Sequence, residues 1–167
     1  IKIMNLLKFK KITDNFIKKY LKYRNFEINV KNSVSKKKIS KLDHYLWWMM
    51  NNNRNSYLVK RNNTDLIILY HSIKLLKNRK FIFPGYFVCG NKFSIFELLE
   101  SIKWQNNKID KISGDKICVI IVAKENFFSN AHCKYFKYKR LNRNTKLYNE
   151  IKKIISFNKK FNIYTRS

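Results

Sequence analysis

The chain has 167 residues, of which 45% are hydrophobic and 16% aromatic, so it can bury one substantial core and is expected to form one domain. Lys and Arg number 37 against 10 Asp and Glu, which gives a formal net charge of +27 and excludes an acidic, polyanion-repelling protein. No apolar run approaches the roughly 20 residues of a membrane-spanning helix, so we expect neither a membrane span nor a signal peptide.

Two explanations of the positive charge stay open. Lys outnumbers Arg 30 to 7, Asn and Ile are abundant, and there are only 3 Gly and 1 Pro, which is typical of a strongly AT-rich coding sequence. Surfaces that bind phosphate usually use more Arg. The charge is therefore either compositional drift or a surface selected to bind a polyanion, and in both cases it attracts an anionic substrate such as a nucleotide.

The three cysteines, Cys89, Cys118 and Cys133, are odd in number and widely spaced, and none has the spacing of a metal-ligand pair. We therefore expect reduced thiols in the core of a cytoplasmic protein, and no metal site.

The hydrophobic periodicity predicts strands and helices in alternation, without a repeat or an internal linker. In chain order, the expected elements are a strand over 5–12, a helix over 14–24, a loop over 31–38, a helix over 40–50, strands over 56–61, 65–73 and 80–89, a helix over 95–105, a strand over 117–123, a helix over 126–135, a strand over 136–141, a helix over 145–157 and a short strand over 161–165.

Three details of these elements carry structural expectations. Pro84-Gly85 interrupts the fourth strand, so the strand is expected to bend, bulge or approach another group closely there. Ser94 is expected to cap the helix that follows it. Glu97 and Glu100 on that helix are expected to face solvent.

The stretch 116–141 predicts a ligand site. Ile117 to Ala123 is an unbroken apolar run, as in a strand buried on both faces, and Asn126 then opens a helix directly. A buried strand with a polar residue and a helix at its carboxyl end is typical of the crevice where open α/β sheets bind ligands.

A family resemblance appears at this stretch. Asn126-x-x-Ser129 is followed after seven residues by Lys137-Tyr138, and this spacing resembles the last third of the GNAT N-acetyltransferases, where the pattern is Asn-x-x-Ala and then Gly-Phe. In front, a segment ending in Arg24-Asn25 and then His44-x-x-Trp47 resembles the opening of members that act on small amines or ribosomal-protein termini. The middle is most similar to acyltransferases of bacterial nonulosonic (sialic-acid-like) sugar pathways, through Trp47-Trp48, Tyr70-His71, Gly85–Phe87 and Ile102-Lys103-Trp104-Gln105.

The resemblance covers roughly residues 4–141 and implies a fold and an activity. The fold would be one α/β domain over residues 4–165, with a mixed central sheet splayed between its fourth and fifth strands and helices on both faces. Residues 1–3 would then be an upstream extension. The activity would be N-acetyl transfer from acetyl-CoA to a primary amine, with an amino sugar nucleotide as the best candidate, no metal, and a small molecule as partner.

The resemblance also implies the site residues. The donor, acetyl-CoA, would contact residues that pair with its pantetheine arm, residues that hold its pyrophosphate, and residues of the motif that begins at Asn126. These residues are Tyr86, Phe87, Val88, Asn91, Lys92, Phe93, Ser94, Asn126 and Ser129. The acceptor side would be formed by Arg24, Asn25, His44, Trp47, Trp48 and Tyr70. His71 is the candidate base.

The chain departs from the family pattern at two places. The glycines of the usual pyrophosphate turn are missing from Gly90-Asn91-Lys92-Phe93-Ser94-Ile95, although close approach of a phosphate normally requires them. Cys133 stands where many relatives have the Tyr that protonates the leaving thiolate, so the catalytic acid is unassigned.

Simpler interpretations stay open at each of these positions. Asn126 could be only a helix cap, Trp47 and Trp48 could belong to the core with His44 on the surface, and His71 could be a structural strand residue. For the whole chain, the alternative to an acetyltransferase is a catalytically degenerate relative or a basic protein that binds nucleic acid or the ribosome.

Overall fold

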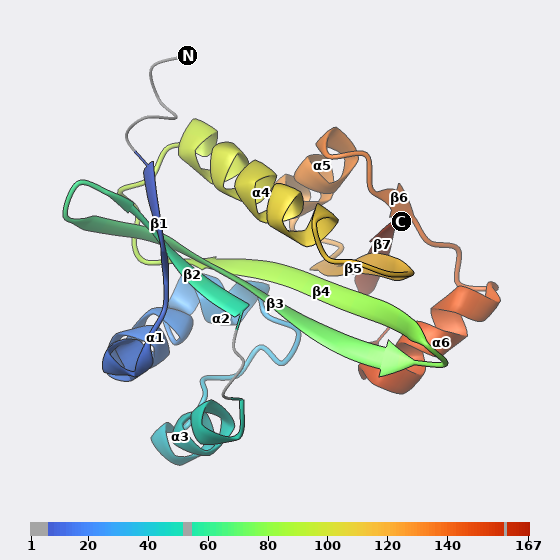
Figure 1. The fold of residues 1–167 in the computed structure, drawn as a ribbon, viewed down its shortest axis with the longest axis horizontal. Coiled ribbons are helices and arrows are strands. Elements are labelled where there is room, and N and C mark those ends of the chain that lie inside the picture. The colour runs from blue at the N-terminus through green and yellow to red at the C-terminus, as the bar shows by residue number, and fades with distance from the viewer. Residues whose placement is uncertain (1–6, 52–54, 159) are drawn as a thin grey trace.

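A seven-stranded sheet organises the molecule (Figure 1), which is a computed structural model that describes residues 7–51, 55–158 and 160–167. The strands are β1 (Leu7–Lys11), β2 (Asn55–Arg61), β3 (Thr64–Leu76), β4 (Arg79–Val88), β5 (Lys116–Ala123), β6 (Lys139–Arg140) and β7 (Phe161–Arg166). The helices are the 3-10 turn η2 (Asp14–Phe16), α1 (Ile17–Arg24), α2 (Glu27–Asn32), α3 (Lys41–Met50), α4 (Ile95–Asp110), α5 (Phe127–Tyr135) and α6 (Lys146–Ile154). Residues 1–6, which include the expected start of the domain, lie outside the described part.

The sheet is mixed, as expected. Its order is β1-β2-β3-β4-β5-β7-β6, and all neighbouring strands are antiparallel except β4 and β5, which are parallel. Helix α4 makes the crossover that a parallel pair requires. The expected single α/β domain with a mixed sheet and helices on both sides is confirmed.

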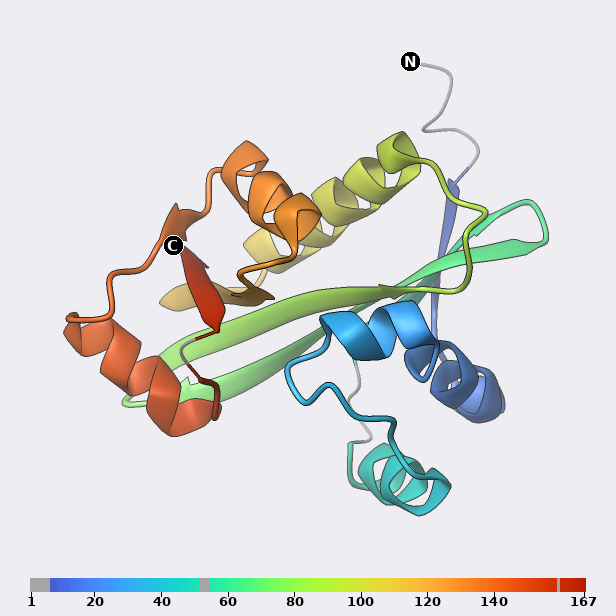
Figure 2. The same ribbon diagram turned by 180° about the vertical axis from the view of Figure 1, so that it is seen from behind.

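Helices cover both faces of the sheet. Helices α4 and α5 lie on one face, while α1, α3 and α6 lie on the other, as Figure 2 shows from behind. Because successive strand residues point to opposite faces, each face has its own core. Leu98 and Ile102 of α4 pack on Ile67 and Leu69, whereas Tyr20 of α1 packs near Ile68.

The N-terminal caps expected from the sequence form. Ser40 and Ser94 accept hydrogen bonds from the backbone N–H groups of Asp43 and Glu97, at 3.0 and 3.2 Å. Side-chain caps of this kind stabilise a helix by about 1 kcal/mol each.

Two local expectations need correction, and a third is decided between its alternatives. Helix α2 is absent from the sequence-based prediction, which had a loop from residue 31 onward. The strand expected over 136–141 shortens to Lys139–Arg140, because the chain turns at Lys137 with φ of 60°. No bulge forms at Pro84-Gly85, since β3 and β4 keep one register from Ile67↔Val88 to Leu76↔Arg79.

Candidate functional site

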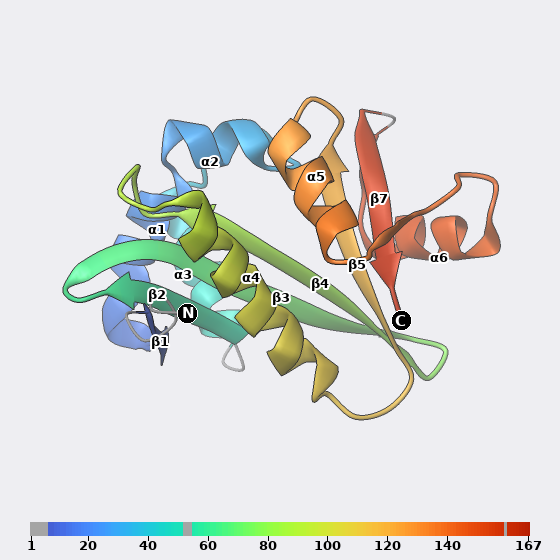
Figure 3. The ribbon, with the colours of Figure 1, turned by 90° about the horizontal axis from the view of Figure 1, so that it is seen from above.

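A cavity of about 830 Å³ opens between β4 and β5, where the two parallel strands separate. They pair only from Lys80↔Lys116 to Ile82↔Cys118, and Figure 3 shows them diverging beyond that point. The expected splay between the fourth and fifth strands is therefore present, and the cavity fills it. Its volume falls in the range of small-molecule sites.

The backbone of β4 is oriented for a ligand in this gap. In an antiparallel pair, residues alternate between bonding their partner strand and pointing their N–H and C=O away from it. The N–H of Cys89 bonds the carbonyl of Leu66, so Val88 and Tyr86 direct their backbone groups away from β3, toward the gap. A ligand amide can pair with Tyr86 as an added strand would.

Val88 already has such a partner from within the chain. The side-chain carboxamide of Asn29, on α2, donates to the Val88 carbonyl at 2.8 Å and accepts from the Val88 N–H at 3.0 Å. Asn29 also donates to the carbonyl of Tyr23 at 2.7 Å and is buried. The side-chain amide of Asn29 thus docks α2 against the edge of β4. It also occupies the backbone groups of Val88, so these are not open to a ligand in the gap.

The ring of Tyr70 leaves room only for a glycine at position 85. A Cβ at Gly85 would lie 2.5 Å from the ring and hydroxyl atoms of Tyr70, so no larger residue fits beneath the ring. The close approach expected at Pro84-Gly85 is therefore a side chain lying across the strand. Tyr70 lines the cavity on the α1 side of the sheet, and burial raises the pKa of its phenol while Arg24 lowers it.

The motif residues converge on the α5 side of the cavity. Asn126 caps α5 by accepting from the Ser129 N–H at 3.0 Å, and it also lines the cavity, so the cap and the site coincide. The hydroxyls of Ser129 and Tyr86 lie 3.3 Å apart. Burial raises the pKa of Tyr86 to about 12, so its phenol keeps its proton at neutral pH.

His132 is a lining residue that the sequence-based prediction missed. Its ring is buried and 5.8 Å from the ring of Tyr86, and burial lowers its pKa to about 4, so it is neutral at physiological pH. Among the described residues, its Nδ1 has no hydrogen-bond partner. The sequence offered one signal for His132. It directly precedes Cys133, the position that the family resemblance had singled out.

The N-terminus of α4 is closed by its own side chains. Glu97 is only 3% exposed, which corrects the expectation of a solvent-facing residue, and its carboxylate accepts from the Ser94 N–H at 2.7 Å. Arg61 neutralises Glu97 at 2.8 Å and donates to the Lys92 carbonyl at 3.0 Å. The residues present therefore do not reproduce a glycine-rich diphosphate cradle.

A second hollow of about 620 Å³ adjoins the cavity on the α1 side, and Arg24 and Tyr70 line both. Its remaining walls are rich in hydroxyl and amide groups: Asn32, Ser33, Ser35, Ser156 and Asn158. Arg24 makes no hydrogen bond or ion pair within the described part of the chain. A half-buried, unpaired guanidinium among polar groups suits an anionic ligand.

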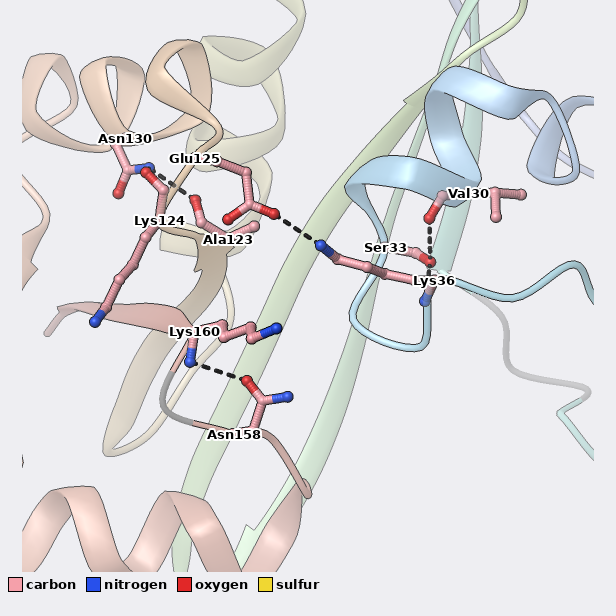
Figure 4. A network of polar contacts seen from close by, with 9 residues as sticks. All are labelled: Val30, Ser33, Lys36, Ala123, Lys124, Glu125, Asn130, Asn158 and Lys160. Atoms are coloured by element: carbon pink, nitrogen blue, oxygen red, sulfur yellow. Dashed lines mark hydrogen bonds and ion pairs between the residues drawn. The ribbon is translucent and has the colours of Figure 1, made fainter.

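An ion pair ties two walls of this region together (Figure 4). Lys36, after α2, reaches Glu125, after β5, at 2.7 Å. Lys36 has φ of 50°, and its N–H bonds the hydroxyl of Ser33, which in turn donates to the Val30 carbonyl. The hydrogen bond from Lys36 lowers the pKa of Glu125.

Several residues expected at the site do not line the cavity. Trp48 donates to Asp14 at 2.9 Å and packs in the core, whereas Trp47 on the same helix is 41% exposed and contacts the ring of His44. His44 is 2% exposed, bonded to the Ile17 carbonyl at 3.0 Å. His71 follows Tyr70 and so points to the opposite, α4-covered face, where burial and Lys108 lower its pKa to about 4.

Of the other residues expected at the site, some line the cavity and some do not. Asn91 and Phe93 line the cavity together with Tyr86, Phe87 and Val88, whereas Lys92 and Ser94 do not. Asn25 exchanges two 2.8 Å hydrogen bonds with the backbone of Ile39, which fixes the chain between α1 and α3.

Across residues 7–51, 55–158 and 160–167, no group of three or more His, Cys, Asp or Glu side chains could hold an ion. The three cysteines are buried and free, and burial raises the pKa of Cys133 to about 12. In the same part of the chain no helix is long and apolar enough to cross a bilayer.

Comparison with solved structures identifies the fold. A domain from Methanocaldococcus jannaschii superposes with a TM-score of 0.71 at 18% identity, covering 96% of this chain and 97% of that one. The ribosomal L7/L12 α-N-protein acetyltransferase RimL, solved with coenzyme A, gives 0.67 at 13% identity, covering 96% and 93%. FdhC, a nucleotide-linked sugar GNAT, gives 0.63 at 15% identity, covering 97% and 86%.

The sequence itself matches no family model and no curated protein. At these identities, the structural likeness establishes the fold, which is that of the GNAT acetyltransferases.

Proposed function

We propose that the protein is an N-acetyltransferase that moves the acetyl group of acetyl-CoA to a primary amine in the β4–β5 cavity. The observation that carries this proposal is the gap between two parallel strands, with the backbone of Tyr86 facing it and a polar hollow at its far end. RimL and FdhC, which share the fold, are acetyltransferases by name and support the reaction class.

The chemistry is direct transfer. The neutral amine attacks the thioester carbonyl to form a carbon–nitrogen bond, and the nitrogen of the tetrahedral intermediate gives up a proton to water. The intermediate then collapses with loss of the carbon–sulfur bond, and the thiolate takes up a proton. The protein must orient the two substrates and stabilise the developing oxyanion. Tyr86 is the donor that we assign to the thiolate, because its phenol is protonated at neutral pH, lines the cavity and lies 3.3 Å from Ser129.

The acceptor would enter through the second hollow. Its hydroxyl and amide groups match a polyol, and Arg24 matches a phosphate or carboxylate. An amino sugar nucleotide carries both features beside a free amine, so it is the acceptor that we favour. FdhC, described as acting on nucleotide-linked sugars, is consistent with this choice.

A thiol-release assay tests the proposal. The full chain is incubated with acetyl-CoA and a panel of amino sugars, amino sugar nucleotides and peptides with free N-termini. We expect acceptor-dependent thiol release with at least one amino sugar nucleotide, and a loss of about 10²- to 10⁴-fold in kcat for Tyr86→Phe. Tyr135→Phe, an exposed residue on α5, is the matched control. Hydrolysis that no acceptor accelerates would contradict the proposal.

A further inference from the structure

We infer that the acyl donor is recognised through the pantetheine arm beside its thioester, and that its nucleotide diphosphate contributes little binding energy. This inference rests on the proposed function, because it concerns the donor of the same cavity. It follows from three features at the α4 end of the cavity, each independent of the others.

The first feature is the anion already present at the N-terminus of α4. A helix N-terminus binds a diphosphate through its free N–H groups and its dipole. Here the capping box engages the N–H groups of Ser94 and Glu97, and the Glu97 carboxylate satisfies the dipole. A diphosphate would have to compete with the Glu97 carboxylate, which already accepts from the Ser94 N–H at this helix N-terminus.

The second feature is where the cation lies. Among the described residues that line the cavity, Arg24 alone carries a full charge, and it lies at the end of α1, on the face of the sheet opposite α4, where it also lines the second hollow. The α4 end presents Phe93 and Ile95 instead. Arg61 is near this end, but its two donor contacts go to Glu97 and to the Lys92 carbonyl. The described residues that line the α4 end of the cavity therefore include no cation that could pair with the diphosphate.

The third feature is Asn29. Its carboxamide holds both outward backbone groups of Val88, the residue of β4 nearest the α4 loop along the gap. A pantetheine arm can therefore pair with Tyr86, but its distal amide meets a position that Asn29 already fills. The part of the donor that this chain can hold tightly is the part next to the thioester.

Calorimetric titration of the full chain tests this without turnover. The probes are pantetheine, coenzyme A and adenosine 3′,5′-bisphosphate, each at 150 and 300 mM salt, because a net charge of +27 attracts any polyanion at low salt. We expect the Kd of pantetheine and of coenzyme A to agree within about fivefold, equivalent to about 1 kcal/mol, at the higher salt. Coenzyme A binding more than about fiftyfold tighter than pantetheine would overturn the inference.

A charge variant adds a second test. Glu97→Gln keeps an oxygen for the cap but removes the negative charge, and Glu100→Gln removes the same charge one turn further along α4. We expect Glu97→Gln to tighten coenzyme A binding by about two- to fivefold while leaving pantetheine unchanged, as for a charge at a helix N-terminus. If both variants change the Kd of coenzyme A equally, Glu97 does not specifically block the N-terminus of α4.

The binding and thiol-release results together distinguish a failure of this inference from a failure of the proposed function. If coenzyme A binds strongly through its nucleotide and thiol release occurs, the inference is wrong and the proposed function stands. If neither pantetheine nor coenzyme A binds and no thiol is released, both are wrong.

Discussion

At the scale of single residues, Arg24 is the group to which the proposed function assigns recognition of an anionic acceptor. Its guanidinium is half-buried, lines both hollows, and has no partner within the described part of the chain. For an acceptor with a phosphate or carboxylate, Arg24→Ala should raise KM by about tenfold to a hundredfold, the value of a charge-assisted hydrogen bond. The KM for acetyl-CoA should stay the same.

Lys22→Ala is the matched control for Arg24, because it removes one positive charge from the exposed side of α1. A neutral analogue of the acceptor should show no difference between the two variants. If Arg24→Ala affects the neutral and the anionic acceptor equally, its role is structural.

His132 should make stability depend on pH. Burial lowers its pKa in the folded state to about 4, whereas an unfolded His titrates near 6.5. Between these values the unfolded chain binds a proton that the folded chain does not, so stability falls as the pH falls from about 6.5 to about 4. The loss is on the order of 3 kcal/mol, and it levels off below pH 4.

Urea denaturation at pH 7, 6, 5 and 4.5 measures this loss. His132→Gln should lose less stability over the interval than the wild type, because Gln does not titrate. His71→Gln should behave similarly, since burial and Lys108 lower the pKa of His71 by a comparable amount. Parallel curves for the wild type and both variants would show that neither histidine is buried in its neutral form.

At the scale of elements, α2 closes one end of the cavity through a single side chain. Asn29→Ala removes its contacts with Tyr23 and Val88, and leaves the Val88 N–H buried without that partner. We expect a destabilisation of about 2–4 kcal/mol in urea denaturation. Asn32→Ala, exposed on the same helix, should change stability by less than about 0.5 kcal/mol. Similar values for the two variants would mean that α2 is not docked by Asn29.

The sequence predicted the elements that have strong periodicity or caps, and it failed where tertiary contacts decide. The apolar run before Ala123 and the cap at Ser94 placed β5 and α4 correctly. Helix α2 is short and has no side-chain cap, and its docking depends on a bond from Asn29 to a strand 59 residues away. No local pattern encodes such a contact.

The candidate site shows the same division. The spacing from Asn126 led to the cavity, because a strand followed directly by a helix fixes where both meet. Side-chain direction was less predictable: Tyr70 and His71 are adjacent, yet only Tyr70 lines the cavity. Glu97 appeared solvent-facing by helical position, but the partner that permits its burial, Arg61, comes from β2.

At the scale of the whole molecule, the basic residues are not confined to one element. Each α-helix and each β-strand of the described chain carries at least one Lys or Arg. A dedicated nucleic-acid interface concentrates basic residues along one element or groove and adds contacts to bases. Basic residues on every element are what compositional drift predicts.

This distribution predicts weak and purely electrostatic binding to nucleic acid. Fluorescence anisotropy with a 20-base-pair duplex should show binding at 20 mM salt that is lost by about 200 mM, with a steep log–log slope, because each phosphate contact releases a counterion. Replacing Lys152 and Lys153 of α6, or Lys18 and Lys19 of α1, by Ala should weaken binding by similar small factors. A Kd below about 10⁻⁷ M that persists at 200 mM salt, or a loss of binding confined to one of these pairs, would instead indicate a dedicated interface and support a nucleic-acid-binding function for this fold.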